Sequence, residues 1–224
     1  MGLLNIIYED DAIVAVDKPD GVLVHRSRIS RDHVFLLQLV RDQVGQFVYP
    51  VHRLDRPTSG VILFAKSSEY ARKLVEQFTS REIQKRYIAV VRGEISKDFV
   101  VDYPIANEPG LEKKEAITEF HLVKNSFFEY PINNYPIVKY SIVEASPKTG
   151  RMHQIRKHLK HVRHPIIGDT KYGDGKNNRA FREHFNIRRL LLHAKEISFI
   201  HPESKERVML SADLPREFSL LIES

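Results

Sequence analysis

Asp55 is the carboxylate with the clearest potential for chemistry in this sequence. It lies between Arg53 and Arg56 in the stretch HRLDRPTSG, whose proline and glycine mark a loop. A carboxylate kept ionised by neighbouring guanidinium groups can act as a nucleophile or as a general base. The alternative is structural, with Asp55 accepting hydrogen bonds from the backbone, Thr58 or Ser59 in an Asx-type turn. The residue types alone leave both interpretations open.

Two basic segments, 81–92 and 151–163, indicate a polyanionic partner. The chain has 35 Lys and Arg against 29 Asp and Glu, a net charge of +6, and the second segment contains no acid. A helix over 152–162 would bury Met152, Ile155, Leu159 and Val162. Its opposite face would be cationic, with His153, Arg156, Lys157, Lys160 and His164. This face fits a phosphate backbone, although an ordinary charged surface helix is the alternative.

The histidines of this segment do not predict a metal site. His158, His161 and His164 repeat at a spacing of three, but no acidic residue lies among them and the neighbouring Lys and Arg residues repel a cation. The chain has no cysteine, which excludes disulfides, Cys-ligated metals and a thiol nucleophile. We expect neither a metal nor a cofactor.

The composition is typical of a soluble globular protein. Of the 224 residues, 42% are hydrophobic and 29% are charged, which fits one large domain or two small ones. No apolar stretch approaches the roughly 18 residues of a membrane helix. The first residues include acids where a signal peptide would have bases. We therefore expect a cytoplasmic protein that does not bind membranes, and a monomer, because no surplus apolar face is evident.

Apolar patterning predicts short strands with helices interspersed among them. The expected strands span 3–8, 12–17, 61–66, 83–91, 116–123, 138–145 and 190–200. The expected helices span 34–44, 67–79 with Ser67 as N-cap, 152–162 and 214–222. Residues 97–114 look irregular, 130–136 look like an excursion between strands, and 168–175 look like a turn. The pattern favours the α+β class, with a mixed, mostly antiparallel central sheet flanked by helices.

The stretch HRLDRPTSGVILFAK resembles the central motif of the RluA-type pseudouridine synthases. Other segments resemble the remaining family motifs, in the family order, and together they cover most of the chain. These segments are VDKPDGVLVH (16–25), IQKRYIAVVRG (83–93), PKTGRMHQIRKHL (147–159), HPIIGDTKYG (164–173) and LLHAKEISFIHP (191–202). The resemblance implies the pseudouridine synthase fold, with residues 1–224 as one catalytic domain and no separate N-terminal RNA-binding domain.

The resemblance implies that the chain isomerises a flipped-out uridine of an RNA to pseudouridine. It assigns the catalytic carboxylate to Asp55, leaving open covalent addition to the sugar or formation of a glycal. Arg156 matches the arginine that pairs with this carboxylate. Tyr87 matches the tyrosine that packs on the flipped base and is the candidate final base, although a core strand tyrosine is the alternative. Arg53 matches the residue that fills the gap in the stack.

The RNA partner is expected to be tRNA. The chain most resembles the family branch that modifies position 65 of tRNA, and the alternatives are large-subunit ribosomal RNA or a non-catalytic RNA-binding role. The missing cysteine argues against a uracil methyltransferase, and the single carboxylate of the central motif argues against a glycoside hydrolase. RNA contacts are expected from Arg53, Arg56, Lys85, Arg86, Arg151, His153, Lys157 and Lys160. Segment 107–115 predicts nothing specific, and segment 125–136 is either a hairpin specific to this branch that contacts RNA or a segment without a particular role.

Overall fold

The computed structural model of the chain describes residues 2–25, 34–106 and 110–223. The chain forms two compact units: unit 1 contains Met1–Lys85 and Ala194–Asp213, and unit 2 contains Arg86–His193 and Leu214–Ser224. Helices are interspersed among strands, and each strand pairing whose register is defined is antiparallel. The predicted α+β class with a mostly antiparallel sheet is confirmed. A single catalytic domain over 1–224 stays a prediction.

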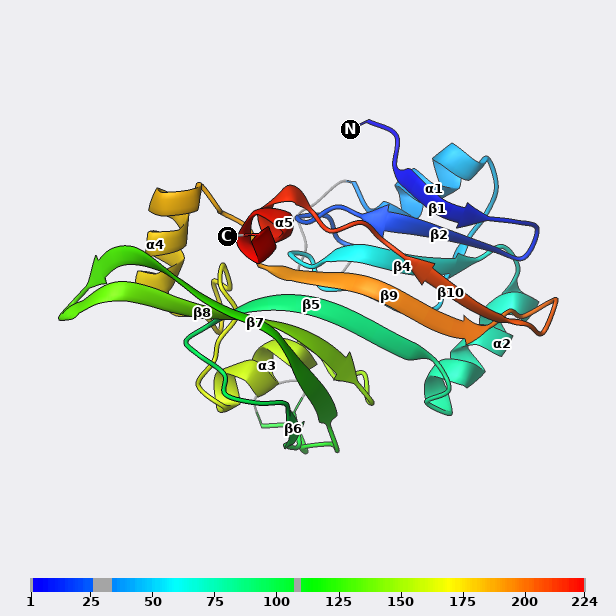
Figure 1. Cartoon of the computed structure of the whole chain (residues 1–224). Helices are drawn as coiled ribbons and strands as arrows, with labels where there is room; N and C mark the ends of the chain where they lie inside the picture. The colour runs from blue at the N-terminus through cyan, green and yellow to red at the C-terminus, as the bar shows by residue number, and fades with distance from the viewer. Residues whose placement is uncertain (1, 26–33, 107–109, 224) are drawn as a thin grey trace. The chain divides into compact units, whose positions relative to one another are not determined.

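Unit 1 is a sheet accompanied by two helices. Its elements are β1 (Asn5–Glu9), β2 (Ile13–Lys18), α1 (Leu36–Val44), β3 (Tyr49–Pro50), β4 (Ser59–Ala65), α2 (Ser68–Thr79), most of β9 (Leu192–Ile200), and β10 (Arg207–Ser211). The strand order is β1-β2-β4-β9; off this path, β10 pairs with β9 and β3 pairs with the end of β4 (Figure 1). The register from Ile13↔Ala65 to Lys18↔Gly60 sets Lys18 beside the start of β4.

Local sequence signals account for most of unit 1. All seven residues of β4 are buried, as expected for an apolar run between two neighbouring strands. The predicted N-cap of α2 is confirmed, because Ser67 Oγ accepts a hydrogen bond from the Tyr70 N–H at 3.2 Å. Helix α1 ends at Gly45, whose φ of 74° is the left-handed conformation that glycine adopts at little cost.

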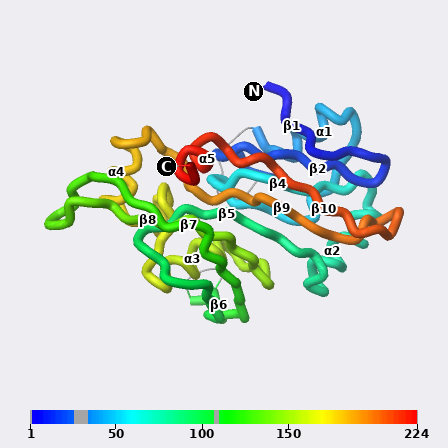
Figure 2. Tube along the Cα trace, viewed as in Figure 1, coloured from blue at the N-terminus to red at the C-terminus, as the bar shows by residue number. Residues whose placement is uncertain are grey.

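Unit 2 is built on a long β-hairpin. Its elements are most of β5 (Gln84–Arg92), β6 (Phe99–Asp102), β7 (Ile117–Ile132), β8 (Tyr135–Pro147), α3 (Gln154–His161), α4 (Gly175–Phe185) and α5 (Arg216–Glu223). The strand order is β5-β8-β7-β6. Figures 1 and 2 show α4 beside the turn of the hairpin. Within the described ranges, no helix is both long and apolar enough to cross a bilayer.

The hairpin corrects the prediction of an excursion over 130–136. Strands β7 and β8 continue through this segment and pair as far as Ile132↔Tyr135. Asn133, with a φ of 55°, lies in the connecting turn. The register shifts between Glu129 and Ile132, so the proline at 131 falls at an irregularity, where a missing N–H costs no regular ladder bond. Prolines here therefore do not end the strands.

Three other elements were not predicted. Residues 99–102 form β6, although 97–114 look irregular in sequence, and 107–109 lie outside the described residues. Strand β10 pairs with β9 from Arg207↔Ile200 to Ser211↔Glu196. Helix α4 begins directly after the expected turn, where the Asp174 side chain accepts N–H bonds from Lys176 and Asn177. The helix at 152–162 is shorter than predicted, because His153 has a left-handed φ of 57°.

An aromatic cluster joins the hairpin to α4. Phe128 of β7 lies edge-on to Phe181 at 5.1 Å and to Phe185 at 4.8 Å between ring centroids, and it stacks on His184 at 4.6 Å. Tyr140 of β8 contacts the same Phe181 ring at 5.4 Å. Phe181 is fully buried. These contacts explain why the hairpin and α4 form together, since neither apolar face is covered without the other.

We expect Phe181→Ala to lower the free energy of unfolding by about 3–5 kcal/mol, because it leaves a cavity among well-packed rings. Urea unfolding measures the change. Val123→Ala is the matched control on the same hairpin, because Val123 is 48% exposed, and its effect should stay within about 0.5 kcal/mol. Equal losses in both variants would contradict the packing described for Phe181.

Candidate active site

Asp55 lies in the turn that leads into β4. Asp55 is half-buried, whereas the nearby Arg53 and Arg56 are exposed. The Thr58 N–H donates to the backbone carbonyl of Asp55 at 3.0 Å, so the turn is closed through the backbone. The Thr58 hydroxyl is buried and has no partner within the described part of the chain. The Asp55 carboxylate therefore does not accept a hydrogen bond from the N–H or the hydroxyl of Thr58, as it would in an Asx-type turn closed by Thr58.

A buried ammonium group holds this turn in place. Lys18 is fully buried at the end of β2, and its Nζ donates to the carbonyls of Pro19, Arg56 and Thr58 at 2.8, 3.1 and 2.8 Å. Three charge-assisted hydrogen bonds offset the desolvation of the charge and fix three backbone carbonyls around it. Two of these carbonyls belong to the Asp55 turn, so Lys18 fixes the backbone conformation of that turn.

Arg56 ties the same turn to the turn at 19–21. Its Nε donates to the Gly21 carbonyl at 2.9 Å, and the Gly21 N–H donates to the Arg56 carbonyl at 2.9 Å. Gly21 has a φ of 81°, a conformation that other residues rarely adopt. The motifs VDKPDG and HRLDRP are thus joined in space by their backbones. Arg56, which was predicted as an RNA contact, therefore has a structural role in this turn.

His52 and Lys85 support the other side of the motif. His52 Nε2 accepts the Leu63 N–H at 2.9 Å, and its ring lies 4.9 Å from that of Phe78. Burial and, to a smaller extent, the positive charge of Lys85 together lower the pKa of His52 to about 3. Burial also lowers the pKa of Lys85, to about 8. The Lys85 ammonium is therefore mostly charged at neutral pH, but it is not a freely solvated phosphate contact.

Tyr87 and Arg86 lie on β5 in unit 2. Tyr87 is half-buried opposite Ala145 and packs against the core of that unit, so its ring combines a core contact with partial exposure. Arg86 is exposed, and its guanidinium lies 3.7 Å from the carboxylate of Glu144. Alternation along the strand places these two side chains on opposite faces of the sheet.

Helix α3 is fixed to the base of the hairpin by a buried amide. Gln154 Oε1 accepts hydrogen bonds from the Arg151 N–H at 3.0 Å and from the Thr149 hydroxyl at 2.7 Å. Its Nε2 donates to the Ile117 carbonyl and to the Thr118 hydroxyl, both at 3.0 Å. Gln154 of the GRMHQIR motif therefore holds the first turn of α3 against the strands and the preceding turn.

Arg156 is buried in an ion pair with Asp169. Its Nε and Nη2 donate to the two carboxylate oxygens of Asp169 at 2.8 and 2.9 Å, a bidentate geometry, and 6% and 1% of the two side chains are exposed. The guanidinium also lies over the Tyr172 ring, 5.1 Å from its centroid. Asp169 was not predicted as a site residue, and the prediction that Arg156 lies on an exposed cationic face is wrong. The only signal was GDTKYG within a family-like segment.

The environment of Asp169 keeps its carboxyl group ionised. Burial alone would raise the pKa, but the hydrogen bonds from Arg156 and from the Tyr172 and Lys171 N–H groups outweigh it and lower the pKa below its ordinary value of 3.8. Gly168, just before Asp169, has a φ of 79°, and a Cβ there would lie 1.8 Å from the Arg189 carbonyl oxygen. The loop therefore holds one conformation, and with it the orientation of Arg156.

The other predicted cations of α3 also contact protein groups. Arg151 Nε donates to the Glu115 carbonyl at 2.9 Å, and Lys157 Nζ donates to the Ala106 carbonyl at 2.8 Å. His153 Nδ1 lies 2.9 Å from the Tyr172 hydroxyl. Lys160 is exposed. The cationic face predicted for this helix is thus largely engaged within the chain.

The predicted site residues are divided between the two units. Asp55, Arg53, Arg56 and Lys85 belong to unit 1. Tyr87, Arg86 and the residues of α3 with its preceding turn belong to unit 2. Each unit thus supplies part of the chemistry that the sequence suggests: a half-buried carboxylate in the first, and a half-buried phenol with a fixed guanidinium in the second.

Comparison with known proteins identifies the class to which this fold and these motifs belong. The model of the RNA pseudouridylate synthase family matches residues 12–161. The chain therefore belongs to the RNA pseudouridylate synthase family, and it is an RNA pseudouridine synthase, an isomerase.

Individual relatives share nearly the whole chain. It is 44% identical to the tRNA pseudouridine synthase C of Vibrio vulnificus, over 99% of this chain and 95% of the relative. It is 45% identical to the protein of the same name from Haemophilus influenzae, over 98% of this chain and 97% of the relative. Identity to the Salmonella typhimurium protein of that name is 47%, over 95% and 86%.

Solved structures confirm the fold. Human RNA pseudouridylate synthase domain containing 1 is similar with a TM-score of 0.76 at 23% identity, over 95% of this chain and 84% of that chain. Human RNA pseudouridylate synthase domain containing 4 is similar with a TM-score of 0.75 at 24% identity, over 96% and 90%. The predicted pseudouridine synthase fold is confirmed.

We expect Asp169→Asn to lower the free energy of unfolding at pH 7 by about 3–5 kcal/mol, because it leaves the buried Arg156 charge without its counter-charge. The pKa of Asp169 is lowered in the folded chain, so its carboxylate contributes stability above pH 3.8 that is lost as the pH falls below this value. The difference between wild type and variant should therefore be constant above about pH 5 and shrink as the pH falls below 3.8. Urea unfolding across this pH range measures it, and a difference that does not shrink would contradict the ion-pair explanation.

Proposed function

We propose that this chain isomerises the uridine at position 65 of tRNA to pseudouridine, with Asp55 as the catalytic carboxylate. The observation that supports this substrate most is that relatives 44–47% identical over nearly the whole chain are named tRNA pseudouridine synthase C. The choice of position 65 rests on the resemblance of the sequence to that branch of the family. Intact Asp55, Tyr87 and Arg156 favour catalysis over a purely RNA-binding role.

The reaction is an isomerisation that needs no group donor and no redox partner. The bond from the sugar C1′ to N1 of uracil breaks, the base turns, and a bond from C1′ to C5 forms. The proton on C5 leaves and a proton is placed on N1, so the atoms balance. The base must first leave the stack for any side chain to reach C1′. Covalent addition and glycal formation both begin with an ionised carboxylate at the sugar, the task proposed for Asp55.

Arg156 is proposed as the residue that orients Asp55. Its contact with Asp169 uses Nε and Nη2, and this pair fixes the plane of the guanidinium. A guanidinium has five N–H donors, so one held in this way can present further donors to a second carboxylate. We assign that second carboxylate to Asp55. Asp169 then acts through Arg156 and is a positioning residue.

Tyr87 and Arg53 are proposed to handle the base. The half-buried ring of Tyr87 can stack on the flipped uracil, and its hydroxyl is the candidate acceptor of the C5 proton. A phenol is a weak base, so the stacking role is the firmer part of this assignment. Arg53 is exposed beside Asp55 and is proposed to fill the gap that the base leaves in the RNA.

The remaining predicted RNA contacts differ in their surroundings. Lys160 is exposed and is proposed to meet a phosphate directly. Those that contact protein groups or, like Lys85, are partly buried are proposed to shape the RNA-facing surface as well as to add charge; they are Arg56, Lys85, Arg86, Arg151, His153 and Lys157.

We expect the position-65 pseudouridine of tRNA to disappear from cells that lack the gene, and to return with the wild-type gene. Sequencing-based mapping of pseudouridine in total tRNA and in ribosomal RNA measures both substrates in one sample. Loss of a pseudouridine from large-subunit ribosomal RNA, with tRNA unchanged, would replace the proposed substrate.

We expect Asp55→Asn to lower the rate of pseudouridine formation at least about 100-fold, because the amide keeps the shape but has no negative charge. The Kd for tRNA should change little, since phosphate contacts dominate affinity. Single-turnover assays and binding titrations on the same tRNA separate the two effects. Asp42→Asn, an exposed position on α1, is the matched control and should keep wild-type turnover.

Appreciable turnover by Asp55→Asn would remove Asp55 from the mechanism. If wild-type protein bound tRNA and left each uridine unchanged, the non-catalytic alternative would hold instead.

A further inference from the structure

Helix α4 presents a row of three cations. Lys176, Arg179 and Arg182 are exposed and spaced by three residues, so they form an oblique row that turns about 120° around the helix over about 9 Å. Ala180 and Phe181 of the same helix are buried. We call these three residues the α4 stripe. The cationic helix was predicted at 152–162, and α4 was not predicted.

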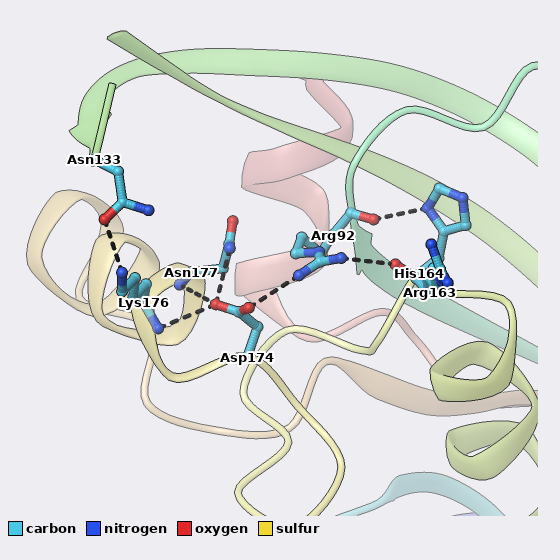
Figure 3. Close-up of polar contacts among 7 residues, drawn as sticks. All are labelled: Arg92, Asn133, Arg163, His164, Asp174, Lys176 and Asn177. Atoms are coloured by element: carbon cyan, nitrogen blue, oxygen red, sulfur yellow. Dashed lines mark hydrogen bonds and ion pairs between the residues drawn. The ribbon is translucent and has the colours of Figure 1, made fainter. Parts of the chain in front are cut away.

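One exposed acid, Glu183, lies on the same side of α4 as the stripe. In the part of the chain that the structure describes, no carboxylate lies within ion-pair distance of the three cations. Glu183 accepts a hydrogen bond from the neutral Tyr130 hydroxyl of the hairpin, so it keeps its charge and the exposed side carries three cations against one acid. Lys176 Nζ donates to the neutral amide of Asn133 at 2.7 Å, which leaves its charge uncompensated (Figure 3).

The acid at the start of α4 is also engaged. Asp174 Oδ1 accepts the N–H groups of Lys176 and Asn177 at 3.1 and 3.0 Å, and its Oδ2 accepts Arg92 Nη1 at 2.9 Å (Figure 3). Arg92 Nη2 donates to the Arg163 carbonyl at 3.0 Å, which ties β5 and the end of α3 to the start of α4. This network holds the first turn of α4 and uses Asp174 as a cap and a counter-charge to Arg92, not to the α4 stripe.

The helix is rigidly mounted between two parts of unit 2. On one side the Phe128 cluster and Asn133 attach it to the hairpin. On the other side Asn178 accepts the Gly168 N–H at 2.8 Å and donates to the Asp169 carbonyl at 3.1 Å. Asp169 is the residue that forms the ion pair with Arg156. Cations held on a fixed support lose little conformational freedom when an anion binds.

We propose that the α4 stripe docks the phosphate backbone of the tRNA substrate, in addition to the contacts made around Asp55. The proposal rests on the proposed function, because it takes tRNA as the polyanion. A row of three exposed Lys and Arg side chains, with a single acid beside it, is a net positive pattern that is complementary to consecutive phosphates. Docking here places RNA against a helix that is bonded to the loop of Asp169, so binding and the orientation of Arg156 share one structural unit.

The test is the salt dependence of tRNA affinity for the full-length chain. The stripe variant is Lys176→Ala, Arg179→Ala and Arg182→Ala together. The matched control removes three exposed cations of unit 1, with Arg72→Ala, Lys205→Ala and Arg207→Ala, and so changes the net charge equally. A second stripe variant, Arg179→Lys with Arg182→Lys, keeps the charge. Unmodified tRNA transcript is titrated at several KCl concentrations, and pseudouridine formation is measured in parallel.

We expect the stripe variant to raise the Kd for tRNA on the order of tenfold at physiological salt, and to reduce the slope of log K against log salt by about 2–3. KM should rise with single-turnover kcat unchanged, the lysine variant should stay close to wild type, and the control should have a smaller effect. Thermal unfolding should be unchanged, since alanine favours helix at exposed positions.

Two results overturn the docking proposal: a wild-type slope in the stripe variant, or an equal loss in the control. Failure of the proposed function is a separate result, in which wild-type protein forms no pseudouridine in tRNA. If the stripe variant then still loses affinity and slope, tRNA docking on α4 stands without that activity.

Discussion

The buried ion pair of Arg156 and Asp169 is the interaction on which the rest of unit 2 depends. A guanidinium removed from water is costly unless a carboxylate meets it in good geometry and further hydrogen bonds satisfy that carboxylate. Here the pairing is bidentate, and Asp169 also accepts the N–H groups of Lys171 and Tyr172. The helix that carries Arg156 and the loop that carries Asp169 must therefore adopt one relative position. The same loop is bonded to α4 through Asn178.

Much of the fold was predictable because its signals are local. The apolar runs of β2 and β4, the Ser67 cap of α2 and the family motifs around Asp55, Tyr87 and Arg156 all lie within short segments. The long hairpin and α4 were not predictable in this way, since each covers an apolar face of the other and the contact of Phe128 with Phe181 spans distant residues. A helical wheel could not show that Arg156 is buried, because its partner comes from outside the helix.

Unit 1 uses a buried charge in a related way. Lys18 is fully buried and is satisfied by three carbonyls, two of them in the turn of Asp55. His52, which follows β3, accepts the Leu63 N–H of β4. It stays neutral because burial lowers its pKa to about 3. Several charged or polar residues of the motifs therefore make structural contacts, although in the sequence they suggest catalysis or RNA binding. A motif of this kind specifies the support of a reactive group as well as the group itself.

The distribution of positive charge follows from the same physics. The strongest basic segment of the sequence, 151–163, uses Arg151, Arg156 and Lys157 to bind groups of the chain itself. Arg156 is buried and paired with a carboxylate, so it offers little charge to a polyanion, whereas Arg151 and Lys157 are half-buried and donate to neutral backbone carbonyls. Helix α4 has fewer cations in sequence, but its exposed side has three cations against the single acid Glu183, and Asp174 is paired with Arg92. The charge available to RNA is therefore determined by which cations the fold leaves exposed, and clustering along the sequence is a poor guide to it.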